Sequence, residues 1–80
     1  MSRKVTGDKS KAVDWIAVGR RIRQLRGFEL TQVDLANQIG VSQSYLSAIE
    51  RGRNEIGVEV LLALSREFKK SIEWLLTGDE

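Results

Sequence analysis

Two short apolar patterns meet at a glycine in the middle of this 80-residue chain, in the stretch TQVDLANQIGVSQSYLSAIERG at residues 31–52. Neither pattern is long enough to form a stable helix by itself, because isolated helices need about 12–15 residues to be even marginal in water. The two helices can persist only if both pack on one shared core. A tight turn at Gly40 then forces them to cross at a steep angle.

Helical periodicity dominates the rest of the chain and predicts a compact all-α domain of five short helices. The first helix is expected from residue 12 to Arg26, before Gly27. The second begins at Thr31, which forms a capping box with Asp34, and the third runs from its cap at Ser42 to residue 52. The fourth covers residues 57–68 and the fifth residues 71–76. The side chains expected to face the core in the first four helices are Trp15, Val18, Ile22, Leu25, Leu35, Ala36, Ile39, Leu46, Ile49, Val58, Leu61, Leu64 and Phe68.

Composition excludes several classes of function. The chain has no cysteine and no histidine, so we expect no disulfide, no zinc site of the Cys/His kind and no histidine acid–base chemistry. No apolar run approaches the roughly 18 residues of a membrane span, and because residues 1–11 are polar we expect no signal peptide there. We therefore expect a soluble cytoplasmic protein with no membrane association, no cofactor, no metal and no evident small-molecule effector.

Charge is distributed unevenly along the chain. Eight of the 13 basic side chains lie in residues 1–26, which hold two acidic ones, although the net charge of the whole chain is only +2. Arg51 and Arg53 follow the second short helical pattern. Basic groups gathered in this way form a positive face suited to nucleic acid. A solvated surface with a basic tail accounts for the same charges equally well.

The second and third expected helices, joined at Gly40, have the helix-turn-helix arrangement. In DNA-binding proteins with this arrangement, the first helix of the pair crosses the DNA backbone and the second projects its outer face into the major groove. The sequence therefore indicates a DNA-binding module.

The stretch from Gly19 to Gly78, about three quarters of the chain, resembles the Cro/CI-type, or xenobiotic-response-element-type, family of helix-turn-helix transcriptional regulators. The matching pieces are GRRIRQLR, LTQVDLANQIGVSQSYLSAIERGR and SIEWLLTG. The resemblance implies a lambda-repressor-like DNA-binding domain at residues 12–80, preceded by a flexible basic arm at residues 1–11. It also implies a homodimer that binds a pseudo-palindromic operator in double-stranded DNA, and a protein that is not an enzyme.

The resemblance implies a role for individual residues as well. Base edges would be read by Gln43, Ser44, Ser47, Ala48 and Asn54, and phosphates would be contacted by Thr31, Gln32, Tyr45, Arg51 and Arg53. Gln32 would also brace Gln43, whose amide has the donor and acceptor that adenine demands. Arg26 and Glu50 would form a structural ion pair. Outside such a motif, Gln43 and Ser44 would simply be solvated residues in the first turn of a helix.

The sequence departs from the family pattern at three places outside the expected recognition helix. The connection GFE at residues 27–29 is one residue shorter than the family norm, and Glu29 stands near the usual glycine. Ile56 replaces a common proline before the fourth helix. Ser65 replaces a common core alanine within that helix.

Several basic and aromatic residues keep two interpretations. Arginines 20, 21 and 23 form either a plain polar face or a further contact with the DNA backbone. Arg3 and Lys4 belong either to a disordered tail or to an arm that enters a neighbouring groove. Tyr45 lies either on phosphate or with its ring half-buried against the second helix. Trp15 and Trp74 are interpreted as core or interface residues. The segment 72–75, with Ile72, Trp74 and Leu75, is the expected dimer surface.

Two other functions compete with a simple repressor. The fold also suits an antitoxin or accessory subunit that binds another protein, and it suits a restriction–modification controller protein. An enzyme is disfavoured, because Asp34 is interpreted as a capping residue and no pair of carboxylates converges in an evident cleft.

Overall fold

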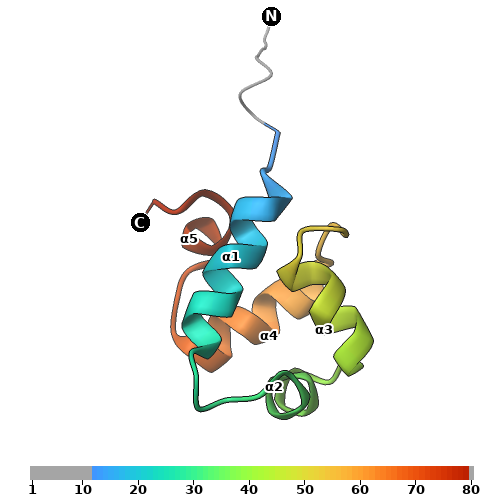
Figure 1. The fold of residues 1–80 in the computed structure, drawn as a ribbon. Coiled ribbons are helices and arrows are strands. Elements are labelled where there is room, and N and C mark those ends of the chain that lie inside the picture. Colours follow the sequence, from blue (N-terminus) through green and yellow to red (C-terminus); the bar gives the residue numbers. More distant parts are fainter. Residues whose placement is uncertain (1–11, 80) are drawn as a thin grey trace, which may run out of the picture.

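The computed structural model describes residues 12–79, which form five helices joined by short connections (Figure 1). The helices are α1 (Trp15–Arg26), α2 (Gln32–Ile39), α3 (Gln43–Glu50), α4 (Val58–Phe68) and α5 (Ile72–Thr77). The predicted all-α, five-helix class is confirmed. Within residues 12–79, no helix combines the length and the apolar character that crossing a membrane requires. The expected arm at residues 1–11, with Arg3 and Lys4, lies outside the described residues.

The predicted turn between α2 and α3 is present. Thr31 Oγ1 accepts a hydrogen bond from the Asp34 N–H at 3.0 Å, and the Asp34 carboxylate accepts one from the Thr31 N–H at 3.4 Å, which completes the capping box. Gly40 ends α2 with φ 79° and ψ 31°, a left-handed conformation that suits glycine. Ser42 then caps α3 by accepting from the Tyr45 N–H at 3.0 Å. Local sequence signals therefore determine both ends of the turn.

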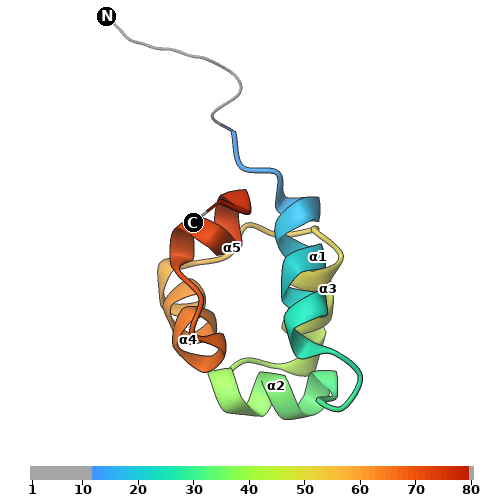
Figure 2. The ribbon, with the colours of Figure 1, turned by 90° about the vertical axis from the view of Figure 1, so that its left-hand side faces the viewer.

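The helices surround one core. α1 packs against α3 and α5, α2 packs against α3 and α4, and α4 packs against α5. Figure 2 shows α4 and α5 on one side, α1 and α3 on the other, and α2 across the end. Because α2 and α3 are too short to be stable alone, they depend on packing against this shared core. Its buried apolar residues are Val18, Ile22, Leu35, Ala36, Leu46, Ile49, Ile56, Leu61, Leu64 and Leu75.

The structure corrects several expected boundaries and orientations. α1 begins at Trp15 rather than at residue 12, because the Asp14 carboxylate caps it by accepting from the Ala17 N–H at 3.2 Å. α3 ends at Glu50, two residues before the expected end. Val58, expected to face the core, is 76% exposed, because the preceding Ile56 fills the core at the start of α4.

Two further residues differ from expectation in how deeply they are buried: Leu75 is more buried than expected, and Ser65 is less buried. Leu75, placed in the expected dimer surface, is fully buried and belongs to the core. Ser65, a polar residue where an alanine is common, is half-buried, and its hydroxyl donates to the Lys70 carbonyl. The hydroxyl of Ser65 is therefore satisfied, and the substitution leaves no unpaired polar group there.

Gly19 lies where α1 crosses α3, and it is buried. A β-carbon at this position would lie 2.5 Å from the carbonyl oxygens of both Ile49 and Glu50. Atoms of a side chain do not approach this closely, so only glycine allows the two backbones to meet as they do. The crossing fixes the C-terminal end of α3, and with it Glu50, against α1.

Lys69 ends α4 in a left-handed conformation, with φ 57° and ψ 44°, and no other non-glycine residue in the described chain has a positive φ. Glycine takes this conformation without the steric cost that a β-carbon brings. We expect Lys69→Gly to raise the free energy of unfolding by about 1 kcal/mol, measured by thermal unfolding. The same change at Arg66, inside the last turn of α4, should lower it by about 1 kcal/mol. A Lys69→Gly variant as destabilised as the Arg66→Gly variant would contradict this expectation.

Candidate nucleic-acid interface

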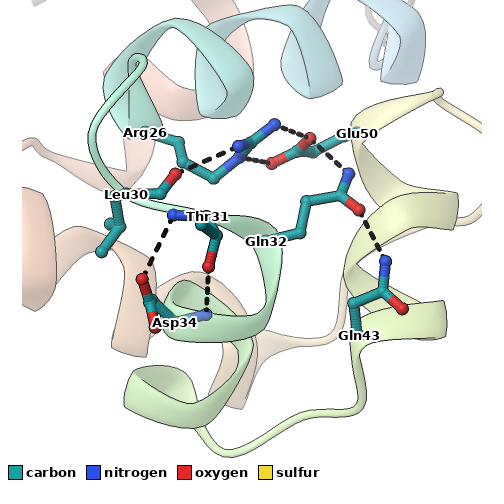
Figure 3. A network of polar contacts seen from close by, with 7 residues as sticks. All are labelled: Arg26, Leu30, Thr31, Gln32, Asp34, Gln43 and Glu50. Atoms are coloured by element: carbon teal, nitrogen blue, oxygen red, sulfur yellow. Dashed lines mark hydrogen bonds and ion pairs between the residues drawn. The ribbon is translucent and has the colours of Figure 1, made fainter.

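A line of polar side chains links α1, through α2, to the first residue of α3 (Figure 3). Arg26 donates to both carboxylate oxygens of Glu50, through Nε at 2.7 Å and Nη2 at 2.9 Å. Gln32 Nε2 donates to Glu50 Oε1 at 2.9 Å. Gln43 Nε2 donates in turn to Gln32 Oε1 at 2.9 Å. The network therefore extends from the buried α1–α3 contact to the exposed start of α3.

The Arg26–Glu50 ion pair lies at the buried end of this network, with the two side chains 15% and 3% exposed. The hydrogen bonds to Glu50 raise the pKa of Arg26 above its ordinary value, against the opposing effect of burial. The guanidinium therefore stays charged at any pH a protein meets. Arg26 Nη1 also donates to the Leu30 carbonyl at 3.1 Å, so this side chain holds the short α1–α2 connection as well.

Four of the five residues expected to read bases lie on α3, and the fifth lies in the connection after it. Gln43 and Ser44 are exposed in the first turn of α3, while Ser47 and Ala48 are half-buried farther along the helix. Asn54 is exposed in the connection that follows. The opposite side of α3 is buried in the core, so this helix has one face committed to the fold and one available for contact.

The residues expected to contact phosphate differ in how free they are. Thr31 is exposed, and its oxygen already accepts from Asp34, but its hydroxyl hydrogen remains available. Gln32 is half-buried and keeps one amide hydrogen besides the one donated to Glu50. Tyr45 is half-buried. Arg51 and Arg53 are exposed after α3, and within residues 12–79 their side chains make no ion pair or hydrogen bond.

The structure separates the three clustered arginines of α1. Arg21 Nη1 donates to the Leu75 carbonyl at 3.0 Å, so Arg21 holds the last turn of α5 against α1. Arg20 and Arg23 instead line an open hollow beside the fully exposed ring of Phe28. Arg21 therefore has a structural role that its neighbours do not share.

Two features of the site have no counterpart in the expectations from sequence. The hydrogen bond from Gln32 to Glu50 joins residues 18 positions apart and has no local signal. The close approach at Gly19 does have a local sequence signal, because a glycine inside an apolar helical stripe indicates a packing constraint.

Two short helices joined by a tight turn, the second with a buried face and an exposed polar face, define a helix-turn-helix domain. The model of the helix-turn-helix family matches residues 20–75. The chain belongs to the Cro/CI-type helix-turn-helix family. It is 44% identical over 61 residues to the HTH-type transcriptional regulator PrpR of Mycobacterium tuberculosis, a match that covers 76% of this chain and 12% of PrpR. The chain spans between 12% and 49% of the length of the three curated relatives that it matches.

Solved structures show the same fold. The chain is similar to the P22 c2 repressor protein in complex with synthetic operator 9T, with a TM-score of 0.72 and 40% identity over 78% of this chain and 96% of that chain. It is also similar to the restriction-modification controller protein C.AhdI from Aeromonas hydrophila, with a TM-score of 0.70 and 30% identity over the same shares. The expected lambda-repressor-like fold is therefore confirmed.

Proposed function

We propose that this chain is a sequence-specific transcriptional regulator, and a repressor, that binds double-stranded DNA with α3 in the major groove. The observation that carries the proposal is the exposed polar start of α3, where Gln43 is held by Gln32 of α2, which is itself bonded to Glu50 at the other end of α3. The likeness to the P22 c2 repressor, whose structure is a complex with an operator, supports it. Such a protein acts in the cytoplasm of a bacterium, whether its gene is bacterial or from a phage.

The proposal assigns two kinds of contact. Direct readout falls to Gln43, which offers a donor and an acceptor to adenine, and to Ser44, Ser47, Ala48 and Asn54 beside it. Anchoring to phosphate falls to Thr31, Gln32, Tyr45, Arg51 and Arg53. Each phosphate that Arg51 or Arg53 neutralises steepens the dependence of log affinity on log salt by about 0.9, whereas the uncharged contacts add hydrogen bonds without this effect. An affinity for duplex DNA that does not change with salt would contradict the proposal.

Reading and anchoring residues are distinguished by their mutants. We expect Gln43→Ala to cost about 1–3 kcal/mol of binding free energy on the preferred duplex and to relax the preference at one base pair. Arg53→Ala should weaken binding to every duplex alike and make the salt slope shallower by about 1. Fluorescence anisotropy on the preferred duplex and on a scrambled duplex measures both effects. Equal losses on the two duplexes for both variants would show that the division is wrong.

We further propose that the DNA-binding unit is a homodimer on a pseudo-palindromic operator. One module makes few base contacts, and two modules related by a two-fold axis would read half-sites about 34 Å apart. With Leu75 in the core, we assign the interface to apolar residues of α4 and α5 that remain accessible, namely the half-buried Ile72 and Trp74 of α5 and the exposed Val58 and Leu62 of α4. α4 and α5 pack together, so both helices can contribute to one interface.

Sedimentation equilibrium tests the dimer. The native chain should sediment as a dimer at micromolar concentration, and Val58→Glu/Leu62→Glu should sediment as a monomer, because two buried charges disfavour an apolar interface. Val33→Glu, at another exposed apolar residue on α2, is the matched control and should stay dimeric. A native chain that sediments as a monomer in the presence and absence of its DNA site would refute the dimer.

A narrower candidate is a controller protein of restriction–modification genes. The similarity to C.AhdI, which covers 96% of that protein, favours it. It predicts that the preferred DNA site lies upstream of such genes in the source genome. A preferred site next to unrelated genes would count against it.

A further inference from the structure

Glu50 gives the polar network a direction. Arg26 donates to both carboxylate oxygens of Glu50, so both oxygens act as acceptors. Gln32 must therefore turn its amide nitrogen, not its oxygen, toward Glu50, and it does so at 2.9 Å. This orientation points the amide oxygen of Gln32 toward α3. There it accepts from Gln43 Nε2, also at 2.9 Å.

The same constraint then fixes which edge of the Gln43 amide remains for a ligand. One Nε2 hydrogen is used on Gln32, so the other hydrogen and Oε1 face outward from the exposed side chain. A donor beside an acceptor matches N7 and N6 of adenine, whereas guanine presents two acceptors, N7 and O6. An amide turned by 180° would present both Nε2 hydrogens and would suit guanine instead.

We propose that Glu50 is a positioning residue that determines base specificity: through Gln32 it sets the orientation of the Gln43 amide, and thereby the preference for adenine over guanine. This inference rests on the proposed function, since it concerns how α3 reads DNA. Glu50 acts from a buried position at the α1–α3 contact, where it is 7% exposed. It contributes a fixed acceptor, and the choice of base follows from the direction of two hydrogen bonds.

Two variants interrupt this network at different points and keep Gln43. Gln32→Met removes the intervening amide and leaves the Arg26–Glu50 ion pair in place. Arg26→Met/Glu50→Met removes the fixed acceptor and leaves Gln32 and Gln43 free to turn together. Replacing a buried ion pair by apolar side chains of similar size is often neutral for stability. If thermal unfolding shows that the double variant does not fold, Arg26→Gln/Glu50→Gln serves in its place, because it also removes the obligate acceptor.

The Gln43→Ala variant first identifies the base pair that Gln43 reads, as the position at which this variant loses its preference. The readout is then the ratio of affinities for two duplexes that differ only at that base pair. The native chain should prefer adenine over guanine there by about tenfold or more, and both variants should reduce the ratio to within about threefold. Arg53→Ala, which removes a proposed phosphate contact, should weaken both duplexes and leave the ratio unchanged. If the network served only to anchor the protein on DNA, its variants would likewise weaken both duplexes and leave the ratio of affinities unchanged.

The possible failures are distinguishable. An unchanged ratio in both variants overturns the inference and leaves the proposed function standing. A ratio that falls in Gln32→Met but not in the charge-free double variant also overturns it, because Glu50 would then not set the direction. If Gln43→Ala alters no preference on DNA that the native chain binds, the inference falls together with the reading role of Gln43. A native chain that binds no duplex refutes the proposed function itself.

Discussion

Gly19→Ala is expected to lower the free energy of unfolding by about 3 kcal/mol, and to lower the midpoint of thermal unfolding by about 15 °C for a domain of this size. A β-carbon at position 19 would meet the carbonyl oxygens of Ile49 and Glu50 at 2.5 Å, and backbone atoms cannot turn away as a side chain can. α1 and α3 would have to separate. The direction of the change in the free energy of unfolding is informative, because at a helix position without close neighbours alanine is more stable than glycine by about 1 kcal/mol.

Gly57→Ala is the matched control for this prediction. Gly57 precedes α4 with φ −66°, and a β-carbon there would have no atom within 4 Å. Its replacement should change the free energy of unfolding by no more than about 0.5 kcal/mol. Differential scanning calorimetry compares the two variants directly. A Gly19→Ala variant as stable as Gly57→Ala would mean that α1 and α3 do not cross as closely as described.

Arg26→Met is expected to lower the free energy of unfolding by about 3–5 kcal/mol, measured by urea unfolding. It leaves Glu50, whose side chain is 3% exposed, with one hydrogen bond from Gln32 and no cation. A buried charge without a partner is far more costly than the net contribution of the intact pair. Adding Glu50→Met to the same chain should therefore recover most of the loss.

Arg20→Met is the control for Arg26→Met, because it removes an exposed arginine from the same helix. The Arg20 side chain makes no ion pair or hydrogen bond within the described part of the chain, so the expected change is within about 0.5 kcal/mol. If Arg26→Met and Arg20→Met unfold at the same urea concentration, Glu50 does not depend on Arg26.

The architecture follows largely from local signals in the sequence. The capping box at Thr31, the left-handed glycine at position 40 and the cap at Ser42 each need only a few neighbouring residues, and each is present as predicted. Burial was harder to predict where either of two neighbouring apolar residues could occupy the same core position. Ile56 takes the core position near the start of α4 and leaves Val58 exposed.

Two links of the polar network, Arg26 with Glu50 and Gln32 with Gln43, were expected from the resemblance and are present, whereas the link between Gln32 and Glu50 was not expected. The exposure of Gln43 and Ser44 follows from the position of Leu46 and Ile49 on the opposite side of α3. The link from Glu50 through Gln32 depends on how three helices meet, and periodicity along one helix carries no information about it.

The most direct test of the account is selection of bound sequences from random duplexes, carried out in parallel with the native chain and with Gln43→Ala. We expect the native chain to enrich a motif with a defined adenine, in two inverted copies about one helical turn apart, and we expect Gln43→Ala to lose that adenine alone. A pool that stays random with the native chain, or a motif that Gln43→Ala leaves unchanged, would contradict the claim that α3 reads base pairs from its exposed face.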